Sequence, residues 1–284
     1  TVQVTGTCSP PVTSSISALT IDTRPVIGTQ PSSATICQGV ATSFTVAASG
    51  TATLTYQWEY STNGGATYAA VVDDADHDNV TSATLNVNAT PLAFNGRLYR
   101  VVVSGAGACV GTSATSNGAA LAVNASPTIS VQPIATQTAC EGTNVTMSVT
   151  ASGAGSLTYQ WFRGATPVGT NSNVLTLTGV TTASAGNYTV QITGTCAPPI
   201  TSSISVLNIN TNVVITSDPI DKVVCVGTPV TFSGTATGTG LTYNWQVNTG
   251  AGFTDIVGET NPNYTFTSAL SENNNRYRLK VTGA

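Results

Sequence analysis

The sequence predicts an all-β protein built from several β-sandwich domains in tandem, and three observations support this prediction. Short segments such as VATSFTVAAS and SATLNVNA alternate apolar and polar residues with a period of two, which is typical of half-buried strands. These segments recur at short intervals between Gly, Pro, Asn and Asp, and helical periodicity is nearly absent. One segment of the chain also occurs twice, which indicates a repeat array.

The repeat begins at the first residue. Residues 1–23 match residues 189–211 at 17 of 23 positions, so the repeat has an offset of 188 in the numbering. A two-stranded fragment of this size cannot bury an apolar face alone, so residues 1–23 are expected to pack on further protein. Two explanations remain open: the chain is an excerpt of a longer array, or a neighbouring chain donates a strand.

The cysteines keep the same period. The offset of 188 separates Cys8 from Cys196, and it also separates Cys37 from Cys225. Cys140 lies between the latter two, at steps of 103 and 85 in the numbering, so each period holds one long and one short unit. The predicted division is therefore the last two strands of a domain in residues 1–23, a long domain in 24–125, a short domain in 126–211, and a long domain that lacks its last strand in 212–284.

Three tryptophans mark equivalent places in LTYQWEY, LTYQWFR and LTYNWQV. In the short unit, EGTNVTMSV, LTYQWFR and ASAGNYTVQI follow one another as strands B, C and F of an immunoglobulin-like sandwich do. Such a sandwich has a core Trp on strand C and a Tyr near the start of strand F. The predicted core markers are Trp58, Trp161, Trp245, Tyr99, Tyr188 and Tyr277. Asn63-Gly64 in the first long unit predicts a tight hairpin turn.

The whole chain resembles the tandem immunoglobulin-like repeats of large secreted and cell-surface bacterial proteins, including the very long adhesins of gliding bacteria. The resemblance rests on ICQGVATSF, ACEGTNVTM and VCVGTPVTF before strand B, on the Trp motifs, and on VSGAGAC, ITGTC and VTG at the end of strand F. It implies an extended head-to-tail array of immunoglobulin-like domains. Because such modules serve as adhesive tips, stalks and spacers, it specifies the fold better than the function.

Six cysteines in such a chain suggest disulfides. In an immunoglobulin-like topology, a Cys before strand B and a Cys after strand F lie at opposite ends, over about 20 Å apart, whereas a disulfide needs Cα atoms within about 7 Å. The favoured pair is therefore Cys37 with Cys196, across the boundary near residue 126. The other four would pair with cysteines of further repeats: Cys8, Cys109, Cys140 and Cys225. Pairing within a domain, Cys37 with Cys109 and Cys140 with Cys196, and free thiols remain the alternatives.

The segment VVDDADHDNV concentrates four aspartates and the one histidine. Asp74, Asp76 and Asp78, at alternate positions, resemble the opening of a calcium loop, because calcium binds several carboxylate oxygens on one curved segment. The glycine and the distal Glu of an EF-hand are missing. A solvated loop between strands is the other interpretation.

Catalytic patterns are weak. His77 with Ser82 or Cys37 as a nucleophile pair is at chance level, so the sequence does not predict an enzyme. The predicted hairpin tips carry Tyr60, Tyr68 and Phe253. These aromatic side chains could form a sugar-stacking surface or complete a sheet edge.

Composition narrows the function classes. Only 7% of the residues are charged and the net charge is −4, so a nucleic-acid partner is not expected, because phosphate binding needs a basic stripe. No apolar run is long enough for a membrane helix, and the N-terminus has no basic-then-apolar leader, so neither a membrane span nor an intact signal peptide is expected.

These observations predict a structural or adhesive segment of a long bacterial cell-surface or extracellular fibre, forming a stiff rod of domains stapled by disulfides. The expected partners are further copies of the repeat in the same chain, and surface glycans or other cells. No cofactor is expected apart from the calcium considered above. The alternative is a carbohydrate-binding or spacer module of a secreted multidomain enzyme.

Overall fold

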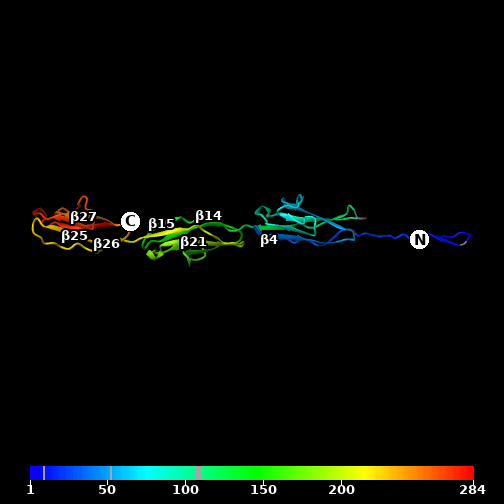
Figure 1. The fold of residues 1–284 in the computed structure, drawn as a ribbon, viewed down its shortest axis with the longest axis horizontal. Helices are drawn as coiled ribbons and strands as arrows, with labels where there is room; N and C mark the ends of the chain where they lie inside the picture. Colours follow the sequence, from blue (N-terminus) through cyan, green and yellow to red (C-terminus); the bar gives the residue numbers. More distant parts are fainter. Residues whose placement is uncertain (9, 52, 107–109) are drawn as a thin grey trace. The chain divides into compact units, whose positions relative to one another are not determined.

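The computed structural model describes residues 1–284 except 9, 52 and 107–109. The described residues form strands and short 3₁₀ turns, and none of their helices could cross a membrane. The contacts divide the chain into two units, each of which consists of β-strands (Figure 1). Unit 1 is Thr1–Pro127 with Gly153–Ser156 and Gly194–Pro198, and unit 2 is Thr128–Ser152, Leu157–Thr193 and Pro199–Ala284.

Unit 1 contains an N-terminal hairpin and a first sandwich. Its elements are β1 (Gln3–Val4), β2 (Val12–Thr13), β3 (Val26–Thr29), β4 (Ala34–Cys37), β5 (Thr42–Thr45), β6 (Ala47–Ser49), β7 (Leu54–Ser61), β8 (Ala69–Ala70), β9 (His77–Asp78), β10 (Thr84–Val87), η1 (Leu92–Phe94), β11 (Leu98–Gly105), β12 (Ser113–Thr115) and β13 (Ala119–Asn124). One sheet has the order β4-β13-β11-β7-β8 with β12 beside β11, and the opposite layer contains β5-β10-β9 and β3-β6.

The first part of unit 2 is a second sandwich with the same plan. Its elements are β14 (Thr128–Val131), β15 (Thr136–Cys140), β16 (Val145–Ser148), β17 (Thr150–Ser152), β18 (Thr158–Arg163), β19 (Thr166–Val168), β20 (Val174–Leu177), η3 (Thr182–Ser184), β21 (Gly186–Thr193), β22 (Ile200–Thr201) and β23 (Ser205–Asn210). The sheet β15-β23-β21-β18-β19 corresponds to β4-β13-β11-β7-β8 of the first sandwich, and β16-β20 and β14-β17 form the other layer.

The remaining strands of unit 2 form a third group. They are β24 (Val214–Ser217), β25 (Pro229–Ser233), β26 (Thr235–Thr237), β27 (Thr242–Asn248), β28 (Phe253–Asp255), β29 (Asn263–Thr267) and β30 (Arg276–Thr282), with η4 (Leu270–Glu272) before β30. They pair as β24-β26, β25-β29 and β28-β27-β30. All strand pairings of the described residues fall within 3–13, 26–124, 128–210 or 214–282. The division into four parts at residues 24, 126 and 212 stays a prediction.

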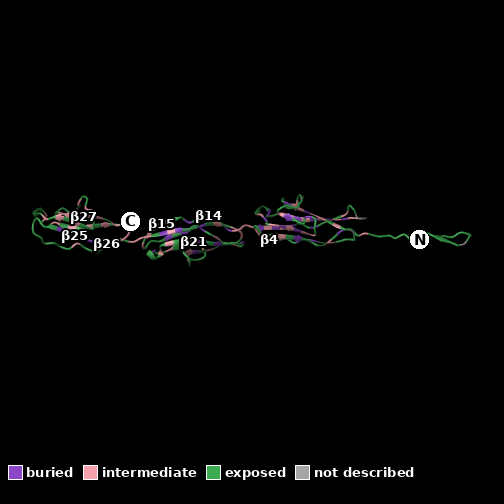
Figure 2. Cartoon of the chain, viewed as in Figure 1, coloured by how far each residue is buried: buried purple, intermediate pink, exposed green. Residues whose placement is uncertain are grey.

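The cores lie between the layers, where the buried residues gather (Figure 2). Trp58, Trp161 and Trp245 are each 0% exposed. Each indole nitrogen donates a hydrogen bond to a backbone carbonyl, at 2.9 Å for Trp58 and Trp161 and 3.0 Å for Trp245. Burial of the indole with its one polar group satisfied explains why Trp stands at this place in all three groups. The predicted all-β class of tandem immunoglobulin-like sandwiches is confirmed.

The equivalent tyrosines differ in their hydroxyl partners. The Tyr188 hydroxyl donates to the Ser184 carbonyl at 2.6 Å, as a tyrosine corner does. The Tyr99 hydroxyl instead lies 3.2 Å from Nε2 of His77. Tyr277 is only partly buried, whereas Tyr99 and Tyr188 are fully buried.

The hairpin predicted around Asn63-Gly64 is present between β7 and β8, but Asn63 and Gly64 do not form a two-residue turn. Gly64 and Gly65 have φ angles of 70° and 92°, but Asn63 does not belong to the residues with positive φ. The Asn63 side chain instead accepts a hydrogen bond from the Thr67 amide at 2.9 Å, which organises a wider loop between β7 and β8. A two-residue turn pattern does not take account of such a contact from an Asn side chain to the backbone.

The N-terminal hairpin has the same strand register as the β21–β22 hairpin of the second sandwich. In β1 and β2, Val4 is opposite Val12, and at the repeat-equivalent positions Ile192 is opposite Ile200 in β21 and β22. The burial differs, because Val4 is 65% exposed whereas Ile192 is 0% exposed. Residues 1–23 are drawn as exposed along nearly their whole length (Figure 2).

Candidate functional site: the disulfide junction

A disulfide joins Cys37, at the end of β4, to Cys196. The two residues are 159 positions apart in the sequence, and their Cα atoms are 5.5 Å apart. Cys196 is fully buried and belongs to the segment Gly194–Pro198 of unit 1, although the strands before and after this segment, β21 and β22, belong to unit 2. This is the pair that the head-to-tail topology favours. A covalent bond therefore ties the loop after β21 to the first sandwich.

Backbone hydrogen bonds surround the disulfide. The Ala154 amide donates to the Ala125 carbonyl at 3.1 Å, and the Thr195 amide donates to the Ala154 carbonyl at 3.4 Å. These bonds hold the segments Gly153–Ser156 and Gly194–Pro198 in unit 1. The disulfide is thus one part of a hydrogen-bonded junction.

A hydrogen bond between linker and turn also occurs at the other predicted boundaries, where the linker amide donates to a threonine side chain. The Thr23 amide donates to Thr51 Oγ1 at 2.6 Å in unit 1, and the Thr211 amide donates to Thr239 Oγ1 at 2.8 Å in unit 2. Thr51, Ala154 and Thr239 each follow the short strand after strand B, namely β6, β17 or β26. Each of these linkers therefore makes a hydrogen bond to the turn at this place.

Three cysteines precede the same backbone turn. Cys37, Cys140 and Cys225 are each followed two positions later by a glycine with positive φ, a conformation that disfavours any side chain. The φ angles are 80° for Gly39, 85° for Gly142 and 84° for Gly227. At Cys140 and Cys225, the hydroxyl of the third residue along donates to the cysteine carbonyl at 2.7 Å. The backbone turn that follows the cysteine is thus the same in all three places.

The remaining cysteines differ in state. Cys8, Cys140 and Cys225 are free and exposed. Cys109 lies outside the described residues. The prediction that these four pair with cysteines of further repeats stays a prediction.

The aspartate-rich loop is organised by its own hydrogen bonds. Asp74 Oδ1 accepts from the amides of Asp76 and His77 at 2.8 Å each, and lies 3.1 Å from Nδ1 of His77. Burial by itself would raise the pKa of Asp74, but these hydrogen bonds and the His77 charge lower it below its ordinary value of 3.8. Asp78 accepts from the Asn88 amide group at 2.8 Å. The structure thus engages Asp74 and Asp78 separately, and the described residues contain no group of three or more His, Cys, Asp or Glu that could hold a metal ion.

The histidine serves the core of the first sandwich. His77 is 4% exposed, and its ring stacks on Phe94 with centroids 5.3 Å apart. Both ring nitrogens have partners, Asp74 on one side and the Tyr99 hydroxyl on the other. Cys37 lies in the disulfide and has no thiolate to offer, so the considered pair of His77 with Cys37 as nucleophile is ruled out.

The aromatic side chains at the hairpin tips are covered by arginines. The Arg100 guanidinium lies 3.6 Å from the Tyr68 ring centroid, and its Nη2 lies 2.7 Å from Glu59 Oε2. In the third group, the Arg278 guanidinium lies 4.0 Å from the Phe253 ring centroid. A ring with a cation on one face has less surface for stacking on a sugar. The repeated pair therefore favours a role in fixing the hairpin.

The fold and the junction define a chain of tandem immunoglobulin-like domains. Residues 126–193 match the immunoglobulin domain family. A three-domain immunoglobulin fragment of titin, an E-to-A variant, superposes with a TM-score of 0.67 over 92% of this chain and 94% of that fragment, at 16% identity. An I-band fragment of titin gives the same TM-score and coverage at 15% identity. At this identity the likeness concerns the fold alone.

One curated protein shows a local sequence match. Endoglucanase C of Cellulomonas fimi is 35% identical over 72 residues, which is 25% of this chain and 6% of the endoglucanase. The chain thus covers a small part of that protein.

Proposed function

We propose that this chain is a structural and adhesive segment of a long extracellular or cell-surface fibre of bacterial origin, in which disulfides at the domain junctions stiffen a rod of immunoglobulin-like domains. The observation that carries the proposal is the Cys37–Cys196 disulfide, which ties the loop after β21 to the first sandwich. Disulfides persist in oxidising compartments, which supports an extracellular location.

The junction contacts support a mechanical role. A linker that is hydrogen-bonded at the same turn each time, and cross-linked at one of these places, resists bending and shear. Repeat proteins gain stability from such interfaces between neighbours. Further copies of the repeat in the same chain are therefore the proposed partners, with surface glycans or other cells as the adhesive targets.

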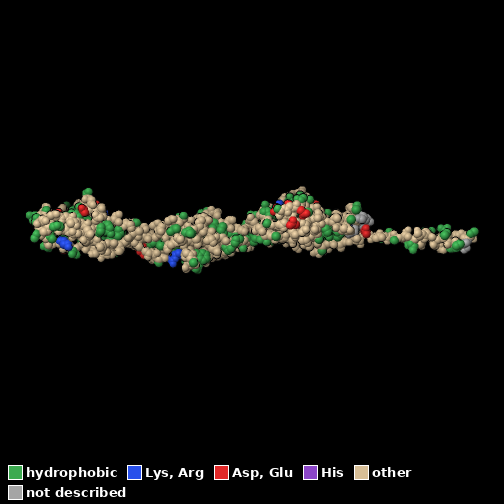
Figure 3. All heavy atoms as spheres, viewed as in Figure 1, with side chains coloured by type: hydrophobic (Ala, Val, Ile, Leu, Met, Phe, Trp, Pro, Cys, Tyr) green, Lys and Arg blue, Asp and Glu red, His purple; other side chains and the backbone are tan. Residues whose placement is uncertain are grey.

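The low content of charged side chains suits a surface that is exposed to changing salt concentrations. Charged side chains are sparse on the face drawn in Figure 3, in keeping with the 7% of charged residues in the sequence. Salt screens charged contacts and leaves neutral ones largely unaffected. We assign the chain no catalytic role.

The test is the flexibility of the junction in solution. We compare the oxidised chain with its Cys37→Ser variant by small-angle scattering and by ¹⁵N relaxation of the sandwiches on either side. The proposal expects greater independent tumbling in Cys37→Ser and none in Cys140→Ser, which removes a free exposed thiol. Equal mobility in all three proteins would contradict it.

The alternative function is a carbohydrate-binding or spacer module of a secreted enzyme, and the local match to Endoglucanase C is the observation that favours it. A glycan array and a cellulose pull-down test this alternative. Binding that is lost in Tyr68→Ala and Phe253→Ala would support it. Absence of binding to either would leave the structural role.

A further inference from the structure

Three Asn-Gly pairs occur in the sequence, at Asn63-Gly64, Asn95-Gly96 and Asn117-Gly118. In such a pair the backbone nitrogen of the glycine can attack the side-chain carbonyl carbon of the asparagine, because glycine has no Cβ that shields this nitrogen. The attack removes the side-chain amide group, which is one reason why asparagine is a thermolabile residue. Hydrogen bonds that hold the two reacting groups oppose the attack, so the contacts of the three pairs decide where it occurs.

Asn63 is tied by its side chain. Its Oδ1 accepts hydrogen bonds from Ser61 Oγ at 2.8 Å and from the Thr67 amide at 2.9 Å. Its Nδ2 donates to Thr67 Oγ1 at 2.8 Å. The side-chain amide therefore cannot turn toward the Gly64 nitrogen without breaking these hydrogen bonds.

Asn95 is tied at both reacting groups. Its Oδ1 accepts a hydrogen bond from the Val123 amide at 2.9 Å. The nitrogen of Gly96, which would attack, donates to the Leu121 carbonyl at 2.9 Å. Both hydrogen bonds join the turn after η1 to β13, and the attack would have to break both of them.

Asn117 is held by its main chain. It lies in the exposed connection between β12 and β13, where its amide donates to Gln30 Oε1 at 2.8 Å. Its carbonyl accepts from Ser116 Oγ at 3.0 Å. Among the described residues, neither the Asn117 side chain nor the Gly118 amide has a hydrogen-bond partner. Both reacting groups are thus free of protecting hydrogen bonds.

The second sandwich shows that the fold does not need an asparagine at this place. Ser203 stands there, and its amide donates to Gln132 Oε1 at 2.9 Å. Its carbonyl accepts from Ser202 Oγ at 2.9 Å. The main-chain contacts of Asn117 are therefore kept when the side chain is that of serine.

The glycine of the third pair is required by packing. A Cβ at Gly118 would lie 2.9 Å from the hydroxyl oxygen of Tyr68, which is closer than a carbon atom approaches. The nitrogen that follows Asn117 therefore stays unshielded.

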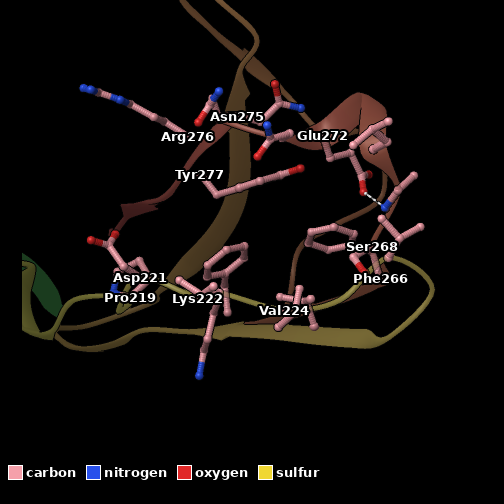
Figure 4. Close-up of a pocket in the computed structure, with 18 of the residues that line it drawn as sticks. Pro219, Asp221, Lys222, Val224, Phe266, Ser268, Glu272, Asn275, Arg276 and Tyr277 are labelled. Carbon is pink, nitrogen blue, oxygen red and sulfur yellow. Dashed lines mark hydrogen bonds between the residues drawn. The ribbon is translucent and has the colours of Figure 1, made fainter.

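Exposure without a following glycine does not create such a pair. Asn273 and Asn274 are exposed, and Asn275 lines a cavity of the third strand group together with Arg276 (Figure 4). The residues that follow these asparagines are Asn, Asn and Arg, whose side chains shield the nitrogen that would attack. They provide a control within the same chain.

We propose that Asn117 is a site of spontaneous deamidation. The Gly118 nitrogen loses its proton to a base in the solvent and forms a bond to Cγ of Asn117. The bond from Cγ to Nδ2 breaks, and Nδ2 takes up a proton and leaves as ammonia, so that a cyclic imide remains. Water then opens the imide: attack at Cγ gives Asp, and attack at the main-chain carbonyl carbon gives isoaspartate. The sum is one water consumed and one ammonia released.

The two products differ in their effect on the first sandwich. Asp keeps the main chain and adds one negative charge. Isoaspartate routes the main chain through Cβ, so the carbonyl that accepts from Ser116 Oγ leaves the main chain and becomes part of a free carboxylate. Ser116 is buried, and its Oγ also accepts from the Val101 amide of β11 at 2.9 Å. Isoaspartate therefore disturbs a contact that holds β11, whereas Asp does not.

The first test keeps the oxidised chain in mildly alkaline buffer and follows it by mass spectrometry of peptides prepared in acid, where the reaction stops. Each hydrogen bond that must break slows the reaction roughly 2- to 10-fold, so Asn117 is expected to convert about 10-fold faster than Asn63 or Asn95. Asn273 and Asn274 are expected to stay unchanged. In the denatured chain the three Asn-Gly pairs should convert at similar rates. Equal rates in the folded chain, or a difference that persists after denaturation, would overturn the proposal.

The second test changes the protection itself. Thr67→Val removes the hydroxyl that holds Nδ2 of Asn63, so the conversion of Asn63 should rise roughly 2- to 10-fold. Thr62→Val is the matched control, at an exposed neighbour, and should leave this rate unchanged. If Thr67→Val also left it unchanged, hydrogen bonds would not set the order of the three pairs, and the assignment of Asn117 would fail.

The third test separates the two products. The unchanged chain and Asn117→Ser are aged side by side, and their Tm values are compared with that of freshly prepared Asn117→Asp. The aged unchanged chain is expected to lose Tm. Asn117→Ser and Asn117→Asp are expected to keep the Tm of the fresh chain, because the first cannot deamidate at this position and the second has an intact main chain. An equal loss in both aged proteins, or no loss in either, would contradict the predicted effect of isoaspartate at residue 117.

Discussion

Cys37 and Cys196 are 159 positions apart in the sequence, and the disulfide between them holds their Cα atoms 5.5 Å apart. The pairing joins the end of β4 to the loop after β21, and the cysteine at that loop is fully buried.

Loss of the disulfide should destabilise the junction. Cys37→Ser is expected to lower the free energy of unfolding of the linked segments by about 2–5 kcal/mol, because the cross-link restricts the unfolded chain. Calorimetry of the oxidised protein measures this change. Cys140→Ser is the control, and identical unfolding curves for the two variants would contradict the prediction.

The buried indole of the second sandwich should be sensitive to truncation. Trp161→Phe removes the hydrogen bond to the Ser172 carbonyl and leaves unfilled volume, at a cost of about 2–4 kcal/mol. In calorimetry, the transition of the second sandwich should move down, and that of the sandwich around Trp58 should not. Equal shifts of both transitions would show that the cores do not melt separately.

A serine should act as a backbone partner in each of these hairpins, and it is buried at Ser116 and Ser202. Ser202 Oγ accepts from the Val190 amide at 3.0 Å and donates to the Ser203 carbonyl at 2.9 Å. Ser116 and Ser14 make the same bonds in their own hairpins. Ser202→Ala should cost about 1–3 kcal/mol because the buried amide loses its acceptor. The neighbouring exposed Ser203→Ala should leave the denaturation midpoint unchanged.

The Asp74 loop should lose stability in acid. Since hydrogen bonds lower the pKa of Asp74 in the folded state, its contribution is present above the ordinary pKa of 3.8 and is lost as the pH falls through the lowered folded value. Asp74→Ala should therefore reduce Tm at neutral pH, and the difference from the unchanged protein should shrink below about pH 4. A difference that persists undiminished at pH 2 would contradict this role.

Calcium should have little effect on the same loop. Asp74 and Asp78 already accept hydrogen bonds from protein groups, and the described residues offer no cluster of metal ligands. Thermal melts with and without millimolar calcium should coincide. A rise in Tm that disappears in Asp76→Asn would revive the calcium interpretation.

The sequence was informative wherever a pattern is periodic. The alternation of apolar and polar residues, the constant offset of the repeat and the three Trp motifs predicted the sandwich class. Each of these signals depends on residues that are close together in the sequence or that recur at a fixed interval. The Cys37–Cys196 pair was favoured once the immunoglobulin-like topology set the direction of strands B and F.

The sequence was less informative where side chains choose among partners. The Tyr99 hydroxyl contacts the ring of His77, which is buried beside it. The two residues are 22 positions apart in the sequence, so no local pattern predicts this contact. The hydrogen bond from a valine amide to a serine hydroxyl was not predicted, although Ser14, Ser116 and Ser202 follow the cysteines at similar distances in the sequence.

Peptide mapping of the oxidised protein under non-reducing conditions tests the central assignment most directly. The account predicts a linked peptide pair that contains Cys37 and Cys196 and separates on reduction. A linked pair of Cys37 with Cys109, or of Cys140 with Cys196, would contradict it, because both would place the cross-link within one domain.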